Sequence, residues 1–595
     1  MAEPLDTVSL LEDRRVRFGA RPLFGEKRGG AFQFLTYAEF ARGVDAARSF
    51  LASLGIGAGD RVAIIAANRV EWATLSFAVH GVGAAFVPMY EAQLEDDWVY
   101  ILRDSRARLC FAANAGIASR VRARSAELPM LDRVIALDAT PEDEGASFAA
   151  LVAAHVAGGV SPRPARRPDR SDVATIVYTS GTTGRPKGVL LSHENLAAQV
   201  AGILAAVPLG PESRLLSFLP WAHVGGGVCE LMGIVSIGAS TALAEGPDKI
   251  LQNLAEVRPS ALVAVPRIWN RLRDAVERQI EAAPAPVRRL FRAAMRARAK
   301  ARRGESPTMR ERVALALAER LILKKVRARL GGRLEFALSG AAALSLEVAE
   351  YIDDLGIVVL EGWGMTELSG LATINRLGER RLGSVGKPID GVRVRIDRSV
   401  GDASVGESGE VVTYGPIVMR GYEGEGQGTG VVIDPDGGLR TGDLGRIDAD
   451  GFLFITGRVK ERFKLENGKY VAPVAIEERV ALSRFVAQAY VHGDNRPHTV
   501  ALVVPDWTSL RELVRARFPH LTSDDDIVAD AAVRAAVHAD IEAQLGAVRS
   551  YERPKAIAIL REEFTTDNGL LTPTLKMKRN AVFERHREIV FGLYR

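Results

Sequence analysis

A stretch rich in glycine and hydroxyl groups, Tyr178-Thr-Ser-Gly-Thr-Thr-Gly-Arg-Pro-Lys-Gly-Val189, carries the residue types that bind phosphate. It follows the apolar run Val173–Val177, which predicts a buried strand leading into a loop. Glycine lets the backbone approach a phosphate closely, hydroxyl and N–H groups donate to its oxygens, and Lys187 adds a positive charge. The stretch is not the common P-loop, because Gly188 follows the lysine instead of Ser or Thr. The alternative interpretation is a polar surface turn.

A second stretch with chemical capability, Glu361-Gly-Trp-Gly-Met-Thr-Glu367, follows the apolar run at 357–360. Ligands of α/β sheets bind outside the carboxyl ends of the strands, so a carboxylate there would face the ligand. Glu367 is a hard oxygen ligand suited to a Mg²⁺ ion that also touches phosphate, and Thr366 can donate to a phosphate oxygen. The alternative is a polar cap that starts the next helix.

Together and in chain order, these stretches and several others resemble the motifs of the AMP-forming adenylating enzymes. That superfamily includes acyl-CoA synthetases, peptide-synthetase adenylation domains and luciferases. The resemblance covers nearly the whole chain, from about residue 30 to 585. Taken singly, the other segments also fit a helix or loop of small residues, an Asx-type turn, a hairpin turn or an exposed lysine. These segments are Leu216–His223, Leu338–Leu344, Arg440–Asp443, Gly457–Lys460, Lys464–Pro473 and Leu571–Arg579.

The resemblance implies a nucleotide site in which adenine lies between Trp363 and the small residues that follow Leu338. Asp443 would accept the ribose hydroxyl protons, and Arg458 would contact ribose or phosphate. Trp363 stands where the family normally has Tyr, and Ala343 stands where it usually has Pro. The implied ATP- and AMP-binding residues are Thr179, Ser180, Gly181, Thr182, Thr183, Gly184, Gly340, Ala341, Ala342, Glu361, Gly362, Trp363, Thr366, Asp443, Arg458 and Lys576.

The resemblance also implies the catalytic residues, which are Lys187, His223, Thr366, Glu367 and Lys576. His223 would lie beside the acyl pocket, and Glu367 would bind Mg²⁺. Lys576 would bridge the attacking carboxylate and the α-phosphate. Lys578 competes for this assignment, but the family's spacing of Lys to Arg favours Lys576, because it ends on Arg579. Many relatives have Ser-Gly before this lysine, whereas this chain has Thr574 and Leu575.

A mobile C-terminal domain is a further implication of the resemblance. Lys460 aligns with the hinge about which family members rotate this domain between two half-reactions. The segment Lys464–Pro473 would then line the channel for the pantetheine arm of coenzyme A. Lys464 and Gly468 are its implied contact residues, with Gly468 allowing close passage of the thiol arm.

The segment Val265–Arg271 and the basic insertion after it look most like long-chain fatty acyl-CoA synthetases. The implied activity is ATP-dependent ligation of a fatty acid, long-chain by this resemblance, to coenzyme A through an acyl-adenylate, with release of AMP and pyrophosphate. ATP, the fatty acid and coenzyme A are the substrates, and Mg²⁺ is the cofactor. The alternatives are a medium-chain or aryl acid–CoA ligase, an acyl-AMP ligase that loads a carrier protein, and a catalytically silent nucleotide-binding protein.

The elements that must position these residues follow an α/β pattern. Strand-like runs at 61–66, 84–88, 262–265, 334–338 and 357–360 alternate with helical segments such as 70–82. This βαβ rhythm predicts layered parallel sheets with helices on both faces. From about 383 to 456, short strands and turn signals predict a small β-barrel-like subdomain. We therefore expect an AMP-binding domain at 1–457 and a mobile α+β domain at 458–595, with the hinge near Lys460.

Bulk composition permits this interpretation. The chain has 595 residues, of which 47% are hydrophobic and 25% charged, as in ordinary globular proteins. Two cysteines give no disulfide framework, and the N-terminus lacks the pattern of a signal peptide, so we expect a cytoplasmic protein. The formal charge of +5 arises from residues 285–330. This segment predicts a solvated helical insertion, with peripheral contact to an anionic inner membrane surface or to coenzyme A as the alternatives. Its stripe of Leu290, Phe291 and Met295 would supply the apolar contact, and we expect no nucleic-acid partner.

Overall fold

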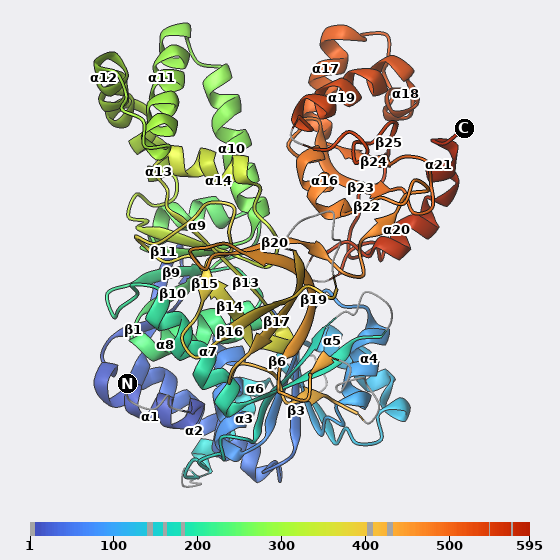
Figure 1. Cartoon of the computed structure of the whole chain (residues 1–595). Coiled ribbons are helices and arrows are strands. Elements are labelled where there is room, and N and C mark those ends of the chain that lie inside the picture. Colours follow the sequence, from blue (N-terminus) through green and yellow to red (C-terminus); the bar gives the residue numbers. More distant parts are fainter. Residues whose placement is uncertain are drawn as a thin grey trace. The chain divides into compact units, whose positions relative to one another are not determined.

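The computed structural model of the protein describes residues 6–139, 147–158, 163–179, 185–400, 408–424, 432–546, 548–572 and 575–595. The chain divides into two compact units (Figure 1). Unit 1 comprises residues 1–394 and 413–439, and unit 2 comprises residues 395–412 and 440–595. The expected boundary at 457/458 separates the two domains that would move relative to each other during catalysis, and it stays a prediction.

The sheets of unit 1 confirm the α/β class. A seven-stranded sheet has the order β18(Gly421–Tyr422), β8(Lys187–Ser192), β7(Val173–Thr179), β4(Ala85–Met89), β3(Arg61–Ile65), β5(Leu109–Asn114) and β6(Arg133–Asp138). A five-stranded sheet has the order β11(Ala261–Ala264), β12(Phe336–Ser339), β13(Val359–Met365), β14(Gly370–Ile374) and β15(Lys387–Pro388). A four-stranded sheet has the order β2(Ala31–Thr36), β1(Pro22–Arg28), β10(Ser240–Leu243) and β9(Arg214–Ser217).

Parallel strands form the centre of the two larger sheets, as the βαβ rhythm predicted. The ladders β4–β3, β3–β5 and β11–β12 are parallel, whereas β7–β8, β8–β18 and β13–β14 are antiparallel. The sheets are therefore mixed rather than wholly parallel. The antiparallel additions carry Lys187 and Tyr422, so they bear directly on the site.

Local sequence explains the helices of unit 1. Helix α2(Tyr37–Ser53) starts with a capping box, in which the Thr36 side chain accepts from the Glu39 N–H and Glu39 accepts from the Thr36 N–H. Helix α3(Val70–Val82) is mostly apolar and buried, and it ends at Gly83 with φ of 80°. Other helices are α1(Thr7–Phe18), α4(Glu95–Asp104), α5(Ala115–Ala123), α6(Phe148–Ala157), α7(His193–Ala206), α8(Gly233–Ile237), α9(Ile250–Val257), α10(Pro266–Glu281) and α14(Leu346–Asp354).

The basic segment is helical, as expected, and forms α11(Ala285–Arg302), α12(Met309–Ala318), a π-helical turn η3(Glu319–Leu323) and α13(Lys324–Ala328). Of the apolar stripe Leu290, Phe291 and Met295, Leu290 and Met295 are partly exposed, whereas Phe291 cannot supply a surface contact. Phe291 is fully buried, because it belongs with Ala294 and Ala297 to the packed face of α11. In the described residues, no helix is long and apolar enough to cross a membrane.

The β-rich segment forms a four-stranded sheet with the order β16(Arg393–Asp397), β17(Gly409–Tyr414), β19(Leu439–Ile447) and β20(Leu453–Arg458). After it, unit 2 contains a short hairpin of β21(Phe463–Lys464) and β22(Tyr470–Val471), and a sheet of β23(Val486–His492), β24(Val500–Pro505) and β25(Ile557–Ile559). Its helices are α16(Pro473–Val480), α17(Trp507–Arg517), α18(Asp524–Ala529), α19(Ala531–Gln544), α20(Arg579–Arg585) and α21(Arg587–Gly592).

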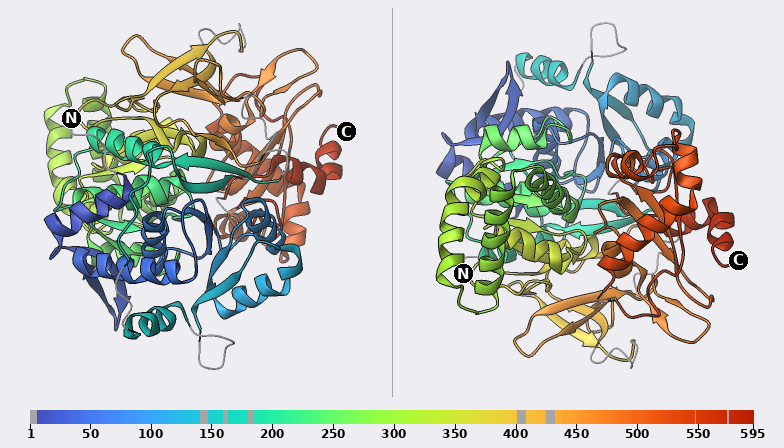
Figure 2. Two further views of the ribbon diagram at one scale, coloured as in Figure 1. Left: turned by 90° about the horizontal axis from the view of Figure 1, so that it is seen from below. Right: turned by 90° about the horizontal axis from the view of Figure 1, so that it is seen from above.

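Both faces of the unit 2 sheet are covered. Along β24, Ala501 and Val503 face a core that includes α16, α17 and α19, whereas Leu502 and Val504 face a core that includes α20 and α21 (Figures 1 and 2). Side chains alternate between the faces of a strand, so a continuous apolar run can serve two cores. The α+β nature of this region is as predicted.

Candidate active site

The predicted phosphate loop connects two antiparallel strands. Thr179 ends β7, and Lys187 begins β8 directly opposite it in register. Ser180, Gly181, Thr182, Thr183 and Gly184 lie outside the described residues. The hairpin therefore holds Thr179 and Lys187 side by side at the loop's base.

Strand β18 brings an aromatic residue to Lys187. It pairs with β8 so that Tyr422 lies opposite Val189. The Lys187 Nζ atom lies 4.8 Å from the centroid of the Tyr422 ring, within cation–π range. The Tyr422 hydroxyl donates to Glu367 Oε1 at 3.0 Å. Tyr422 thus connects the predicted phosphate lysine to the predicted metal ligand.

Tyr422 is the residue that sequence reasoning missed. Burial raises the pKa of its hydroxyl, as does the Glu367 carboxylate, so the hydroxyl stays protonated as a donor near neutral pH. It lies far along the chain from Lys187, within a strand of only two residues, Gly421–Tyr422. Neither spacing nor composition singles it out, because only the β8–β18 pairing brings it to the site.

The motif around Trp363 lies within a strand, not after it. Strand β13 runs through Met365, so the expectation that Glu361 follows the strand is corrected. The Gly383 N–H donates to Glu361 Oε1 at 3.3 Å, and the side chain is buried. Burial raises the pKa of this carboxyl to about 7, although the Gly383 N–H opposes the shift. Trp363, two residues on, is also largely buried.

Two segments predicted to contact adenine are neighbours. Strands β12 and β13 are parallel with Ser339 opposite Glu361, and a Cβ added at Gly340 would lie 3.6 Å from the Gly362 carbonyl oxygen. Ala341 has φ of 68°, in the left-handed region that a residue with a side chain seldom adopts. Such strained residues occur where the surrounding structure fixes the backbone, often at ligand sites. Ala342 follows and is exposed.

Thr366 and Glu367 lie in a 3-10 turn, η4(Thr366–Leu368). The Met419 N–H donates to the Glu367 carbonyl at 2.9 Å, and the Ser369 hydroxyl donates to the Ile417 carbonyl at 2.8 Å. The chain before β18 thus anchors the turn on both sides. Thr366 is buried, whereas Glu367 is partly exposed.

His223 precedes a π-helix, η2(Gly225–Met232). The Gly225 N–H donates to His223 Nδ1 at 3.1 Å, which leaves Nε2 to carry the proton of the neutral ring. A Cβ added at Gly226 would lie 2.3 Å from the Pro220 carbonyl oxygen, so glycine is required there by close backbone packing. On the same helix, burial raises the pKa of Glu230 to about 8, an effect that the nearby Ser217 only partly offsets.

In unit 2, the predicted ribose residues form an ion pair. Asp443 on β19 and Arg458 on β20 are register partners, and Arg458 Nε lies 2.7 Å from Asp443 Oδ1. Asp443 is buried, and its N–H donates to the Thr441 hydroxyl at 3.1 Å. Lys460 follows in an exposed turn after β20.

The predicted coenzyme A segment contains the hairpin turn that was its structural alternative. The Leu465 N–H donates to the Lys469 carbonyl at 2.9 Å, and Gly468 has φ of 84°. Lys464 is exposed, with its Nζ 5.7 Å from the Tyr470 ring centroid. The turn and a channel role are compatible.

Lys576 lies on an exposed turn whose backbone is strained. Leu575 before it has φ of 61°, a conformation that glycine adopts more readily than leucine. The Lys576 N–H donates to the Thr572 hydroxyl at 3.0 Å, while Thr574 lies outside the described residues. Arg579 anchors the following helix, because its guanidinium lies 2.7 Å from Glu477 Oε1 in the core.

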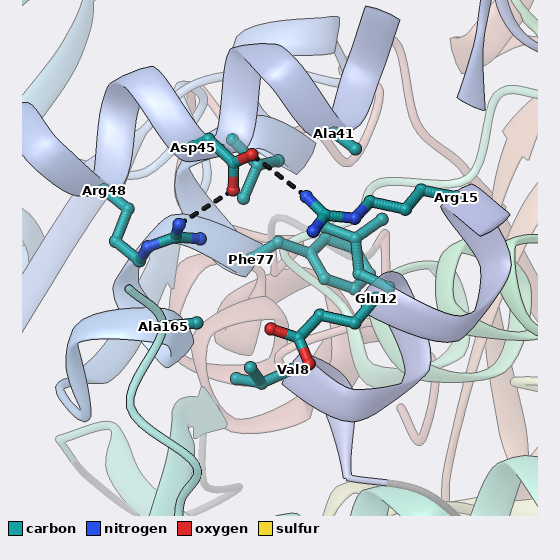
Figure 3. A pocket seen from close by; sticks show the side chains of 11 residues that line it. Val8, Glu12, Arg15, Ala41, Asp45, Arg48, Phe77 and Ala165 are labelled. Carbon is teal, nitrogen blue, oxygen red and sulfur yellow. Dashed lines mark hydrogen bonds and ion pairs between the residues drawn. The ribbon is translucent and has the colours of Figure 1, made fainter. Parts of the chain in front are cut away.

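A separate pocket in unit 1 contains none of the predicted site residues. It has about 20 Å³ of space, enough for one water molecule, between α1, α2 and α3. Figure 3 shows Arg15 and Arg48 both reaching Asp45 at its rim, at 3.1 and 2.8 Å. This salt-bridged surface is not a candidate active site.

Comparison with known proteins covers both units. The family model described as AMP-binding enzyme matches residues 12–423, and the model described as AMP-binding enzyme C-terminal domain matches residues 460–565. The chain is 35% identical over 590 residues to the long-chain-fatty-acid–CoA ligase FadD15 of Mycobacterium bovis, covering 95% of this chain and 93% of that protein. It is 31% identical to the peroxisomal long chain acyl-CoA synthetase 7 of Arabidopsis thaliana, covering 95% and 82%.

Solved structures share the fold. The adenylation domain of a carboxylate reductase from Mycobacterium chelonae aligns with a TM-score of 0.79 at 23% identity, covering 100% of this chain and 92% of that chain. The anthranilate CoA ligase AuaEII, solved in complex with anthranoyl-AMP, aligns with a TM-score of 0.74 at 20% identity, covering 100% and 99%.

Proposed function

Because this chain belongs to the family of AMP-binding enzymes, we propose that it joins a long-chain fatty acid to coenzyme A. ATP is consumed, and AMP and pyrophosphate are released. The observation that carries this proposal is the similarity to long-chain-fatty-acid–CoA ligases along almost the whole length of both chains. The arrangement of Lys187, Tyr422 and Glu367 supports it, because it assembles a cation, a donor and a carboxylate suited to a metal–phosphate group.

In the proposed first step, a fatty-acid carboxylate oxygen attacks the α-phosphorus of ATP. The bond to pyrophosphate breaks, and an acyl-adenylate forms. No protein nucleophile is needed, because the carboxylate is already ionised at neutral pH. Lys187 and Thr366 bind phosphate oxygens, and Lys576 supplies a positive charge to the α-phosphate and the attacking carboxylate. Catalysis by these residues is positioning and charge stabilisation.

The residues around Glu367 fit a Mg²⁺ ion that binds together with ATP. In the described residues, no three His, Cys, Asp or Glu side chains cluster as a metal site. A single carboxylate shared with substrate phosphates is a common way for proteins to hold Mg²⁺. Glu367 is that carboxylate, and the Tyr422 hydroxyl holds its Oε1 in position. When bound, the ion neutralises charge on the phosphates.

Contacts to the nucleoside part of ATP are proposed for each unit by itself. In unit 1, the Trp363 ring and the backbone at Gly340, Ala341 and Ala342 contact adenine. In unit 2, Asp443 accepts hydroxyl protons from the ribose, and Arg458 holds that carboxylate in place while contacting ribose or phosphate. The remaining phosphate contacts come from Thr179 and the loop after it.

In the proposed second step, the coenzyme A thiol attacks the acyl carbonyl, a thioester forms and AMP leaves. Lys460 is the hinge for a domain movement that withdraws Lys576 between the steps. Lys464 and Gly468 line the channel for the thiol arm. Peripheral contact of the basic segment 285–330 with an anionic membrane also remains a prediction.

The test is pyrophosphate release measured over saturated fatty acids of graded length, with acyl-CoA detected in the same samples. We expect both products with long-chain acids. A maximum with medium-chain or aryl acids would replace the substrate assignment. Pyrophosphate release without acyl-CoA, together with acylation of a carrier protein, would favour a carrier-loading ligase. The absence of both products would favour a silent nucleotide-binding protein.

A further inference from the structure

One face of α12 and η3 exposes large apolar side chains at every fourth residue. Met309, Val313, Leu317 and Leu321 are 74%, 53%, 49% and 51% exposed. Four residues are close to one helical turn, so these side chains line one side of the helix. We refer to these four residues as the α12 apolar face. Isolated exposed apolar residues are ordinary, but an aligned row on one helix indicates an interaction surface.

The opposite side of this helix packs against α11. Ala318 and Leu323 are fully buried, as are Phe291 and Ala294 of α11. Figures 1 and 2 show α11 and α12 lying side by side, at the end of unit 1 away from its sheets. The helix therefore has two apolar sides. One packs against α11, and the other, the α12 apolar face, is exposed to solvent.

The charge on this surface that is not balanced by an ion pair is positive. Each of the three acids in segment 285–330 is engaged by a cation: Glu305 by Arg303 at 2.8 Å, Glu311 by Lys300 at 2.9 Å, and Glu319 by Arg298 at 3.3 Å and by Arg327. In contrast, five exposed cations near the α12 apolar face have no ion-pair partner within the described residues. They are Arg310, Arg312, Arg320, Lys324 and Lys325.

We propose that the α12 apolar face and these five cations dock the enzyme on an anionic lipid bilayer. Exposed apolar side chains flanked by Lys and Arg are the pattern of helices that lie in a membrane interface. The apolar row would enter the acyl boundary, while the cations contact anionic headgroups. A zwitterionic bilayer or a protein partner of neutral charge fits this surface less well, because neither supplies the negative charge that would balance the five cations. The inference does not depend on the proposed reaction.

Co-sedimentation of the full-length protein with vesicles tests the docking, without ATP, fatty acid or coenzyme A. The vesicles are phosphatidylcholine alone or an equal mixture of phosphatidylcholine and phosphatidylglycerol. We expect binding to the mixture and little to phosphatidylcholine, with a loss at high salt because salt screens surface charge. Equal binding to both, or to neither, would overturn the proposal. Because no substrate is present, this outcome is separate from any failure of the ligase assay.

Two variants separate the apolar and charged contributions. Leu317→Ser with Leu321→Ser should weaken binding at least about tenfold, because apolar burial is lost. Arg320→Gln, Lys324→Gln and Lys325→Gln together should weaken it about a hundredfold. Val16→Ser on α1 is the control for an isolated exposed apolar residue. The triple replacement Arg515→Gln, Arg517→Gln and Lys555→Gln is the charge control, since all three are exposed in unit 2.

Thermal melting checks that the variants are folded. If the leucine variant is unfolded, the charge variant alone still tests the proposal. Wild-type binding by the charge variant would contradict the proposal. Analytical ultracentrifugation without vesicles addresses a second copy of the chain as the occupant. A concentration-dependent dimer that the leucine variant abolishes, with no vesicle binding by the wild type, would replace the bilayer by a dimer interface.

Discussion

The two lysines proposed to act on phosphate are held in different ways. Lys187 of unit 1 begins a strand of a seven-stranded sheet and lies against the Tyr422 ring. Lys576 of unit 2 is exposed on a turn, after a residue with left-handed backbone. The two settings differ in the exposure of the lysine and in the backbone conformation before it, and they fit the proposal that one lysine stays with the phosphates and the other is withdrawn.

The contrast extends to the residues around each lysine. On the Lys187 side, Tyr422 contacts Glu367, and Thr366 next to it is buried. Near Lys576, the firm element is Arg579, which forms a largely buried ion pair with Glu477 in unit 2. Because the ion pair of Arg579 fixes the chain three residues after Lys576, the turn that carries Lys576 can be exposed and still be held at one end. We therefore expect loss of the Arg579–Glu477 ion pair to lower the stability of unit 2, and loss of the Lys576 side chain to lower the rate of catalysis.

Removing the anchor should have the largest effect. Arg579→Met leaves the largely buried Glu477 without its partner, which should lower the free energy of unfolding of unit 2 by about 3 kcal/mol. Urea titration of the full chain measures this change. The double variant Glu477→Met with Arg579→Met removes both charges and should recover most of the loss. A loss below about 1 kcal/mol in the single variant would show that this ion pair is not an anchor.

Removing the exposed lysine should affect one half-reaction only. Lys576→Ala should slow acyl-adenylate formation about 10²- to 10³-fold, because a preorganised charge is lost. Conversion of supplied acyl-AMP to acyl-CoA should be spared, since Lys576 is withdrawn by then. The assays are pyrophosphate release and thioester formation, with Lys578→Ala as the matched control. Equal losses in both half-reactions would contradict the role, and a selective loss in the control would move it to Lys578.

Burial of Glu361 in unit 1 should appear as a pH dependence of stability. The pKa of Glu361 is raised from 4.5 to about 7 by burial, so in this window the unfolded chain releases a proton that the folded chain keeps. Stability therefore falls as pH rises from 4.5 to 7, by about 3 kcal/mol for this group. Glu361→Gln stays neutral and should lack this contribution.

Melting curves of wild type and Glu361→Gln across that pH range provide the measurement. The difference between the two proteins is the relevant quantity, because the pKa of Glu230 is also raised by burial, to about 8. A difference that does not change with pH would mean that Glu361 titrates normally.

Tyr422 tests whether the restraint on the unit 1 site matters for catalysis. Tyr422→Phe keeps the ring beside Lys187 but removes the hydrogen bond to Glu367. We expect acyl-adenylate formation to fall about tenfold, because a hydrogen bond to a charged group contributes on the order of 1.5 kcal/mol. The Mg²⁺ concentration for half-maximal rate should rise, which a purely structural role would not produce. Unchanged rate and Mg²⁺ dependence would exclude the positioning role.

The smallest expected effect concerns the turn before Lys576. Leu575→Gly removes the left-handed strain of a residue with a side chain, and this should raise the free energy of unfolding of unit 2 by up to about 1 kcal/mol. Leu575→Ala retains the strain and is the control. Urea titration distinguishes them. If glycine destabilises more than alanine, the strain is not what limits this turn.

Much of this site could be predicted from the sequence, because its motifs are local. The strand before the phosphate loop, a strand at Glu361 and the turn at Gly468 each depend on neighbouring residues, and the structure contains all three, although the strand at Glu361 extends through Met365. Prediction failed where contacts are remote. Tyr422 reaches Lys187 only through strand pairing, and the burial of Phe291 follows from the packing of α11 in the folded unit.

The sequence by itself determined the order of the elements and the chemical types at the site, since periodicity, turn residues and short motifs are properties of nearby positions. The tertiary structure decided which side chains meet, which carboxyls are buried and which helix face is outward. Burial and pairing depend on residues outside the local segment, such as Tyr422 and Glu367, which are 55 positions apart. That is why the raised pKa of Glu361, the Tyr422–Glu367 hydrogen bond and the exposed row from Met309 to Leu321 emerge only from the folded chain.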